Sequence, residues 1–260
     1  MMQNSTAVIT GATSGIGAAY AKKFAEKGYD LIITGRRQEK IEALANEVRN
    51  SQNVQVEVVL AELSEKEGVH KVIEKMQGKK VDILVNNAGF GDKNLFQDCH
   101  LDVAMQMAKV NVLAPMELIR TVLPGMIERK CGTIINISSS SVYLVVSKNS
   151  VYSGVKAFLK TFTEALHMDL MGTNVKVMTV CPGLTHTDFH EKMGIDKSKQ
   201  TDRGLLSWMS CEEVVNSSLK DLEKGKVICI PGMKNKLLIR LLNLLPKKIY
   251  DKMMDSFRKK

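Results

Sequence analysis

The sequence predicts a doubly wound α/β fold, in which helices cover both faces of a parallel β-sheet. Short runs rich in Val and Ile alternate with longer stretches of helical periodicity along the 260 residues. Strands buried inside a parallel sheet have such continuous apolar runs, and a strand followed by a helix and another strand forms a βαβ unit. A glycine-rich turn between the first apolar run and the first helical stretch is a further sign of this fold.

Seven apolar runs are expected to form the strands, and six periodic stretches the main helices. The expected strands are 6–10, 30–34, 54–60, 83–86, 133–138, 175–181 and 227–231. The expected helices are 18–27, 38–50, 66–76, 114–129, 152–171 and 212–224. Because no long linker or internal repeat interrupts them, residues 1–233 are predicted to form one domain. The polar stretch 191–203 breaks the alternation and indicates a loop or lid over the carboxyl ends of the strands, where ligands bind in such sheets.

Residues 234–260 are predicted to form a separate basic, amphipathic helical tail. Apolar residues recur there at helical spacing, and Pro246 should divide the segment into two helices. The tail carries nine Lys or Arg against two Asp, a net charge of +7, which leaves +2 for residues 1–233. A nearly neutral body argues against a nucleic-acid partner. The tail could lie on an anionic membrane surface, cover a substrate entrance or pack on a second subunit, and the sequence leaves these three open.

The remaining bulk features favour a cytoplasmic protein. No run of about 18 apolar residues is present, so no membrane-crossing helix is expected, and the N-terminus lacks the pattern of a signal peptide. The five cysteines are scattered without a CxxC motif, as expected for reduced thiols. His186 and His190 have helical spacing, but no carboxylate or cysteine cluster completes a ligand set, so no metal is expected.

The glycine turn predicts a phosphate-binding site. Gly11, Gly15 and Gly17 lie between the first strand and the first helix. Glycine permits the tight backbone and the close approach of a pyrophosphate, and the helix N-terminus offers free N–H groups. The predicted dinucleotide contacts in this turn are Gly11, Thr13, Ser14, Gly15, Ile16 and Gly17. An ordinary glycine-rich βα turn is the alternative.

The residues after the second strand favour NADP(H). An NAD site would place an acidic residue there to hold the ribose 2′-hydroxyl. Instead the strand runs into Arg36 and Arg37, whose guanidinium groups suit a 2′-phosphate. The alternative is that both arginines simply begin a solvated helix.

Tyr152 and Lys156 have the spacing of a proton-donor pair. They are four residues apart, so on a helix they share a face. Reduction of a carbonyl by hydride requires a proton for the developing alkoxide, and a nearby ammonium should lower the pKa of the phenol from its usual value of about 10. Ser139 ends a predicted strand, where it can hydrogen-bond the carbonyl oxygen; Ser138, Ser140 and Ser141 remain alternatives.

In this order along the chain, the motifs resemble those of the short-chain dehydrogenase/reductases. The resemblance covers residues 6–231 and rests on the glycine turn, the run Asn86-Asn87-Ala88-Gly89, Asn111, Ser139, the Tyr152/Lys156 pair, and Cys181-Pro182-Gly183 leading to Thr187. It implies a Rossmann-type sheet and a homodimer or homotetramer assembled through the helices at 114–129 and 152–171.

The resemblance also implies roles for individual residues. Asn111 would organise a water relay, Ser139 would orient the substrate, Tyr152 would be the general acid/base, and Lys156 would bind the ribose and tune the phenol. Further cofactor contacts would come from Asn87, Ala88, Gly89, Tyr152, Pro182, Gly183, Thr185 and Thr187. The family usually has an adenine-contacting Asp after the third strand, and Glu62 and Leu63 stand there instead.

These observations together predict an NADPH-dependent carbonyl reductase, reversible as an alcohol dehydrogenase. The substrate would be a small molecule, an apolar keto or acyl compound. The alternative is a regulatory or membrane-docked protein that binds NADP(H) without turnover. An intact set of Asn111, Ser139, Tyr152 and Lys156 argues against this alternative, because binding alone needs no acid.

Overall fold

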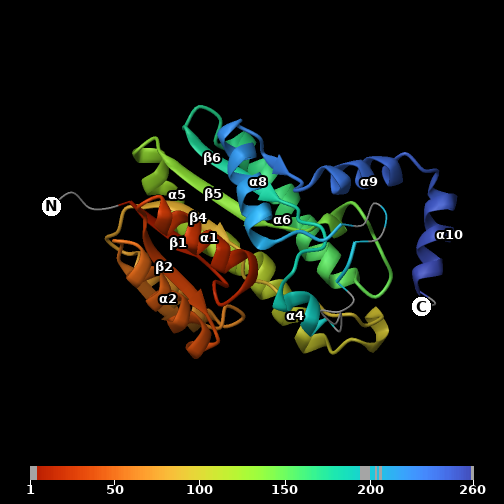
Figure 1. Cartoon of the computed structure of the whole chain (residues 1–260), viewed down its shortest axis with the longest axis horizontal. Helices are drawn as coiled ribbons and strands as arrows, with labels where there is room; N and C mark the ends of the chain where they lie inside the picture. The colour runs from red at the N-terminus through yellow and green to blue at the C-terminus, as the bar shows by residue number, and fades with distance from the viewer. Residues whose placement is uncertain (1–4, 194–199, 203, 205–206, 259–260) are drawn as a thin grey trace.

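The computed structural model describes residues 5–193, 200–202, 204 and 207–258, which form a parallel sheet between two layers of helices (Figure 1). The seven strands lie in the order β3-β2-β1-β4-β5-β6-β7. They are β1 Thr6–Ile9, β2 Asp30–Gly35, β3 Val56–Leu60, β4 Val81–Asn86, β5 Gly132–Ile137, β6 Val175–Val180 and β7 Ile228–Cys229. The strand order reverses between β1 and β4, so their carboxyl ends border the crevice where ligands bind in open α/β sheets.

Two hydrophobic cores hold the helices against the sheet. On one face lie α1 Gly15–Glu26, α2 Gln38–Ser51 and α8 Cys211–Glu223. On the other lie α3 Lys66–Met76, α5 Ala114–Glu128 and α6 Ser150–Asp169. Successive strand residues alternate between the cores, as the pleat requires: Val8 belongs to the second core and Ile9 to the first. The predicted doubly wound fold is therefore confirmed.

The element boundaries differ from prediction in a few places. Helix α1 begins three residues earlier than expected, at the second glycine of the turn, and the last strand is shorter. The sequence did not predict α4 Leu101–Ala108, the π-helical turn η2 Lys109–Leu113 or the short helix α7 Asp188–Lys192. Helix α4 continues through η2 into α5, and a π turn shifts the helical period, which hides the pattern. The expected lid at 191–203 begins within α7, and its residues 194–199 and 203 lie outside the described residues.

The continuous helical stretch Leu101–Glu128 bears on the expectation that no helix crosses a membrane. By length and composition it could cross a membrane, although no such segment was predicted. Its most apolar window is 44% buried inside the structure. Leu118 and Ile119 of this stretch pack in the second core, so it serves as a core layer of the fold.

The tail forms two helices, α9 Met233–Asn243 and α10 Lys247–Arg258, and the predicted break at Pro246 is confirmed. Helix α9 packs on the body through Asn235 and Ile239, both buried. The Asn235 side chain donates a hydrogen bond to the carbonyl of Pro231 at 3.0 Å. Helix α10 contacts the body through the Tyr250 hydroxyl, which donates to the carbonyl of Val145 at 3.0 Å.

A buried polar contact joins α1 to α8. The Tyr20 hydroxyl and the Ser218 hydroxyl lie 2.5 Å apart, and both residues are fully buried. Burial raises the pKa of Tyr20 well above its usual value. The Ser218 hydroxyl also lies 2.7 Å from the carbonyl of Val215, to which it donates.

We expect Tyr20→Phe to lower the free energy of unfolding by about 1 kcal/mol, because one buried hydrogen bond is lost while Ser218 keeps its bond to Val215. Urea denaturation measures this change. Tyr29→Phe, at the edge of the same core, is the matched control and should change stability by less than about 0.5 kcal/mol. Equal losses in the two variants would contradict the assignment.

Candidate active site

The structure brings the four predicted catalytic residues together at the carboxyl ends of β4 and β5. Asn111 lies on η2, Ser139 follows β5, and Tyr152 and Lys156 lie on α6. The Lys156 ammonium lies 5.8 Å from the centre of the Tyr152 ring. A Cβ atom placed on Gly89 would lie 2.6 Å from Asn111 Oδ1 and 3.2 Å from Lys156 Nζ. Asn111 and Lys156 therefore converge on Gly89, where only a glycine leaves them room.

Lys156 is buried and held by the backbone. Its ammonium donates a hydrogen bond to the carbonyl of Ile137, at the end of β5, at 2.8 Å. Its own carbonyl accepts a hydrogen bond of 2.8 Å from the Ser138 hydroxyl. Burial lowers the pKa of Lys156 to about 8, because the charged form is poorly solvated there. The amine therefore changes charge close to neutral pH.

The phenol of Tyr152 remains protonated at neutral pH. Burial raises the pKa of Tyr152 to about 12, and the hydrogen bond with Ser139 opposes only part of this rise. The expected lowering of the pKa of this phenol is therefore not found in the protein alone, where desolvation is the largest cause and raises it. The result is a phenol that carries the proton that a general acid must donate.

The geometry distinguishes Ser139 from its three serine neighbours. Ser139 makes the hydrogen bond to Tyr152. Ser138 points the other way, with its hydroxyl on the backbone of Lys156. The backbone N–H of Ser140 donates to the Pro182 carbonyl at 2.8 Å, and that of Ser141 donates to Ser139 Oγ at 3.1 Å. The sequence could not make this choice, because it depends on how the chain leaves β5.

Asn111 is positioned by the π-helical turn. Its side-chain amide donates a hydrogen bond to the carbonyl of Met107 at 2.9 Å, which fixes the orientation of the amide. Its Oδ1 atom is buried and has no hydrogen-bond partner among the residues that the structure describes. A π turn inside an α-helix often marks a functional site. This Oδ1 acceptor, close to Gly89 and Lys156, can bind a water molecule that relays a proton.

The glycine turn is closed against the end of β4. Gly11 and Gly15 have φ angles of 66° and 64°, which favour glycine. A Cβ on Gly17 would lie 2.4 Å from Asn87 Nδ2. The Asn87 amide donates to the carbonyls of Thr10 at 2.9 Å and Gly11 at 3.0 Å. Asn87 therefore holds the turn by contacts that leave no space for larger side chains.

The N-terminus of α1 fits the phosphates of a dinucleotide. Its N-cap residue, Ser14, makes no side-chain hydrogen bond to the first turn of the helix, so these N–H groups can receive an anion. A Cβ on Gly15 would lie 3.1 Å from Thr187 Cγ2, which places Thr187 against the turn from the opposite wall. This wall continues back to β6 through Thr185, whose hydroxyl donates to the carbonyl of Gly183 at 3.1 Å.

Arg37 lies against the glycine turn and is already paired. Its guanidinium donates to Thr13 Oγ1 at 2.8 Å and Ser14 Oγ at 2.7 Å. It also forms an ion pair of 2.7 Å with Asp188 at the start of α7. Lys40 lies 3.0 Å from the same carboxylate. Arg37 and Lys40 hold the pKa of Asp188 well below its usual range. The Asp188 carboxylate therefore stays ionised between these two cationic side chains.

Arg36 and Glu62 form a second pair, at 2.9 Å. Although burial raises the pKa of Glu62, hydrogen bonds from Ser64 and Arg36 bring it below its usual value. The Glu62 carboxylate accepts from the Ser64 N–H at 3.0 Å and from the Ser64 hydroxyl at 2.9 Å. Glu62 thus organises the turn before α3, and Leu63 beside it is buried. An adenine contact of these two residues stays a prediction.

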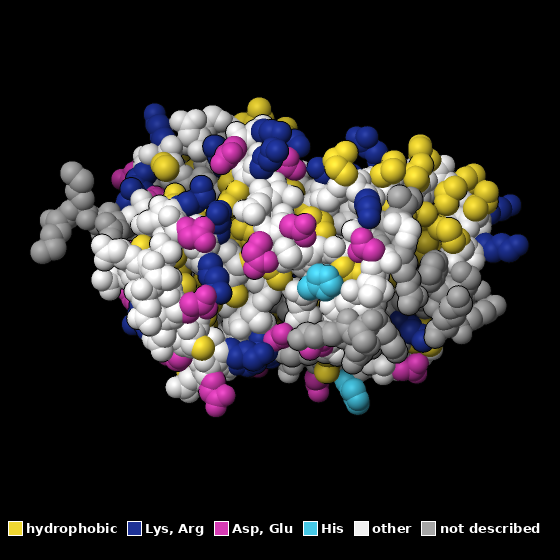
Figure 2. All heavy atoms as spheres, viewed as in Figure 1, with side chains coloured by type: hydrophobic (Ala, Val, Ile, Leu, Met, Phe, Trp, Pro, Cys, Tyr) yellow, Lys and Arg dark blue, Asp and Glu magenta, His cyan; other side chains and the backbone are white. Residues whose placement is uncertain are grey.

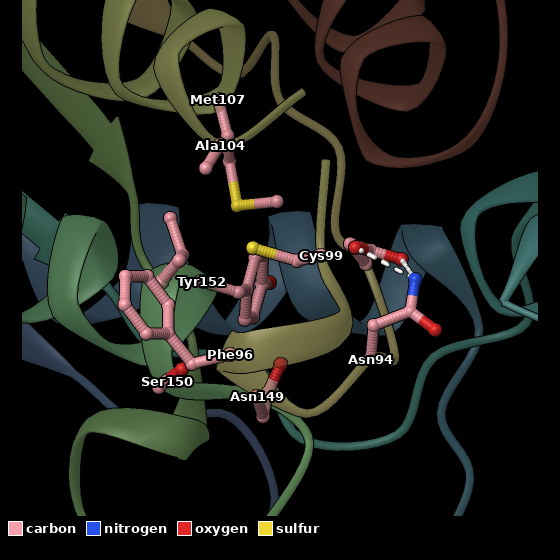
Figure 3. A pocket seen from close by; sticks show the side chains of 10 residues that line it. Asn94, Phe96, Cys99, Ala104, Met107, Asn149, Ser150 and Tyr152 are labelled. Atoms are coloured by element: carbon pink, nitrogen blue, oxygen red, sulfur yellow. Dashed lines mark hydrogen bonds between the residues drawn. The ribbon is translucent and has the colours of Figure 1, made fainter. Parts of the chain in front are cut away.

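A small hollow of about 10 Å³ beside Tyr152 was not foreseen from the sequence. Side chains from the 92–99 segment, from α4 and from the start of α6 line it, among them Phe96, Cys99, Met107 and Tyr152 (Figure 3). From α7, the ring of Phe189 lies 5.6 Å from that of Tyr152. No motif marks these residues, because they come together only through the packing of α4 and α7 on α6.

A dinucleotide cradle next to a protonated phenol and a buried lysine defines an oxidoreductase that uses a nicotinamide cofactor and acts on C=O and CH–OH groups. The family model described as short chain dehydrogenase matches residues 5–198. The chain belongs to this family, and the resemblance inferred from its motifs is confirmed.

Characterised relatives and solved structures agree with this assignment. The chain is 38% identical to sulfoacetaldehyde reductase 2 of Chromohalobacter salexigens, over 70% of this chain and 73% of that protein. It is 29% identical to the very-long-chain 3-oxoacyl-CoA reductase of Mus musculus, over 97% and 79%. The structure of a short-chain dehydrogenase from Sphingobium yanoikuyae in complex with NADPH superposes with a TM-score of 0.82 at 27% identity, over 98% of this chain and 93% of that one.

We expect kcat/KM for carbonyl reduction to fall as the pH rises through about 8, where Lys156 loses its positive charge. Tyr152 does not limit the rate there, because its phenol stays protonated up to a pH of about 12. The fall should approach about tenfold per pH unit. In Lys156→Arg, whose guanidinium stays charged, the maximal rate should be lower and this limb of the profile should disappear. An unchanged limb in Lys156→Arg would assign it to another group.

Proposed function

We propose that this protein is an NADPH-dependent carbonyl reductase that also runs in reverse as an alcohol dehydrogenase. The observation that carries the proposal is the group of Ser139, Tyr152 and Lys156 beside the glycine cradle, in which Tyr152 and Lys156 are buried. Its phenol holds a proton at neutral pH, and its lysine can still be charged there. A protein that only binds a dinucleotide has no use for such a pair.

When held by the glycine turn and the N-terminus of α1, the cofactor would supply the hydride that the carbonyl carbon receives. Ser139 donates a hydrogen bond to the carbonyl oxygen and holds it near the phenol. Tyr152 gives its proton to the oxygen as negative charge develops, so the carbonyl gains one hydride and one proton and becomes an alcohol. The Lys156 ammonium, 5.8 Å from the ring centre, offsets the charge of the phenolate. The open Oδ1 of Asn111 accepts from the water that returns a proton through Lys156.

The preference for NADPH rests on the cations at the end of β2. Arg36, Arg37 and Lys40 gather there, against two carboxylates, those of Glu62 and Asp188. A 2′-phosphate dianion can replace Asp188 on Arg37 and Lys40 and accept from the hydroxyls of the turn. The NADPH complex of the Sphingobium yanoikuyae protein supports this choice.

The apolar residues near Tyr152 support a keto or acyl substrate. Phe96, Met107 and Phe189 lie around the phenol, and one relative reduces very-long-chain 3-oxoacyl-CoA according to its name. A panel of keto esters, acyl thioesters, steroids, quinones and semialdehydes, followed by NADPH oxidation with NADH as control, tests this proposal. Turnover confined to small polar carbonyl compounds would contradict it.

We also propose a homodimer or homotetramer assembled through α5 and α6. Large apolar side chains are exposed on both helices, including Met116, Ile127, Phe158 and Met168. Light scattering of the purified protein gives the mass of the assembly. A monomer at all concentrations would exclude this arrangement.

Tyr152→Phe should lose turnover by about 10²–10⁴-fold, because the general acid is removed. Its NADPH affinity, measured by fluorescence titration, should stay the same. Tyr29→Phe also removes a tyrosine hydroxyl, but Tyr29 packs on Phe24, outside the catalytic group. It is the control variant and should keep its turnover. A fully active Tyr152→Phe would exclude this mechanism.

The double variant Arg36→Ala with Arg37→Ala should bind NADPH about 10- to 100-fold more weakly, because charge-assisted hydrogen bonds to the 2′-phosphate are lost. Its affinity for NADH should fall much less. Asp188→Asn should strengthen NADPH relative to NADH, because an anion that competes for Arg37 is removed. Lys22→Ala, from an exposed pair with Glu47, controls for net charge. Equal losses for both cofactors in the arginine variant would remove the argument for NADPH.

A further inference from the structure

The outer face of α9 is apolar and exposed. Met233, Leu237, Leu241 and Leu244 are 79%, 49%, 46% and 80% exposed. Their spacing puts them on one side of the helix, while Asn235 and Ile239 on the opposite side are buried against the body. Figure 2 shows hydrophobic side chains gathering at the place where Figure 1 draws α9.

Ile249, at the start of α10, is a further large apolar side chain of the tail that is exposed, at 55%. We call Met233, Leu237, Leu241, Leu244 and Ile249 the tail surface. Packing within this chain does not explain it, because the other side of α9 makes the contacts with the body. An exposed cluster of large apolar side chains that is rimmed by polar residues marks an interaction site.

Cations border the tail surface. Lys234 and Arg240 flank the leucines of α9 on either side, and Lys247, Lys248 and Lys252 are exposed on α10. Lys234 pairs with Asp202 at 3.3 Å, and both side chains are exposed, so the pair contributes little binding energy. The tail therefore combines an apolar stripe with most of the net positive charge of the protein.

We propose that the tail surface docks on an anionic lipid bilayer. Helix α9 would lie parallel to the membrane with its leucines below the headgroups, and the lysine and arginine side chains would reach the lipid phosphates. The negative potential of such a surface attracts every one of these cations. A second copy of this chain is a poorer occupant, because a twofold axis through the surface would bring the same cations together.

The stretch Leu101–Glu128 is the rival membrane contact, since it is long and apolar enough to span a bilayer. Its interior-facing residues, such as Leu118, belong to the core of the domain. Leu101 and Met105 on α4 are exposed and have the same four-residue spacing as Leu237 and Leu241. This pair therefore supplies a matched control for the experiment.

Co-sedimentation of the full chain with vesicles tests the proposal. The wild type should pellet with phosphatidylcholine vesicles that contain phosphatidylglycerol, and much less with phosphatidylcholine alone; high salt should weaken the binding. Leu237→Glu with Leu241→Glu should reduce the bound fraction about tenfold or more. Leu101→Glu with Met105→Glu should bind like the wild type. Circular dichroism and NADPH affinity verify that the tail variant is folded.

Three results would overturn the proposal. The first is a wild type that stays in solution with anionic vesicles or binds both lipid mixtures equally. The second is a tail variant that still binds, or a control pair on α4 that loses binding. The third is a wild type that does not bind vesicles and that forms a larger oligomer, measured by light scattering, than the tail variant does. This result would assign the tail surface to contact with a second copy of the chain. None of these results depends on NADPH oxidation, so the proposed reductase activity is tested separately.

Discussion

The close approach of the β1 and β4 ends is the constraint on which the site depends. Asn87, directly after β4, donates to the carbonyls of Thr10 and Gly11 and so holds the glycine turn that follows β1. Two residues further on, Gly89 leaves room for Asn111 and Lys156. One short segment therefore joins the phosphate cradle to the catalytic group. A side chain at Gly17 or Gly89 would push the two halves apart.

Burial then tunes the two catalytic groups in opposite senses. The same loss of water raises the pKa of the Tyr152 phenol and lowers that of the Lys156 amine, because in both cases the charged form is disfavoured. The neutral phenol keeps its proton until the reaction creates charge on the substrate. The hydrogen bond from Lys156 to Ile137 and the π turn that carries Asn111 keep both partners in place. The sheet supplies this placement, and α7 adds a wall beside Tyr152 through Phe189.

Much of this arrangement could be predicted from the sequence, because the signals are local. Apolar periodicity located the strands and six helices, and spacing alone put Tyr152 and Lys156 on one helix face. What failed depends on contacts between distant segments. The π turn under Asn111 interrupts the helical period, and the pairing of Arg37 with Asp188 joins residues 151 positions apart. The rise in the pKa of Tyr152 was missed because burial depth is a property of the folded chain.

The buried amine of Lys156 has a consequence for chemical labelling. With a pKa of about 8, a substantial fraction of this amine is unprotonated, and hence nucleophilic, at pH values where an ordinary lysine is almost fully charged. The burial that creates this reactivity also keeps bulky reagents out, since the residue is only 4% exposed. Lys156 should therefore react more slowly with bulky amine reagents than the exposed lysines of the surface, despite its lower pKa. The burial that lowers the pKa of this amine thus also protects it from large reagents in solution.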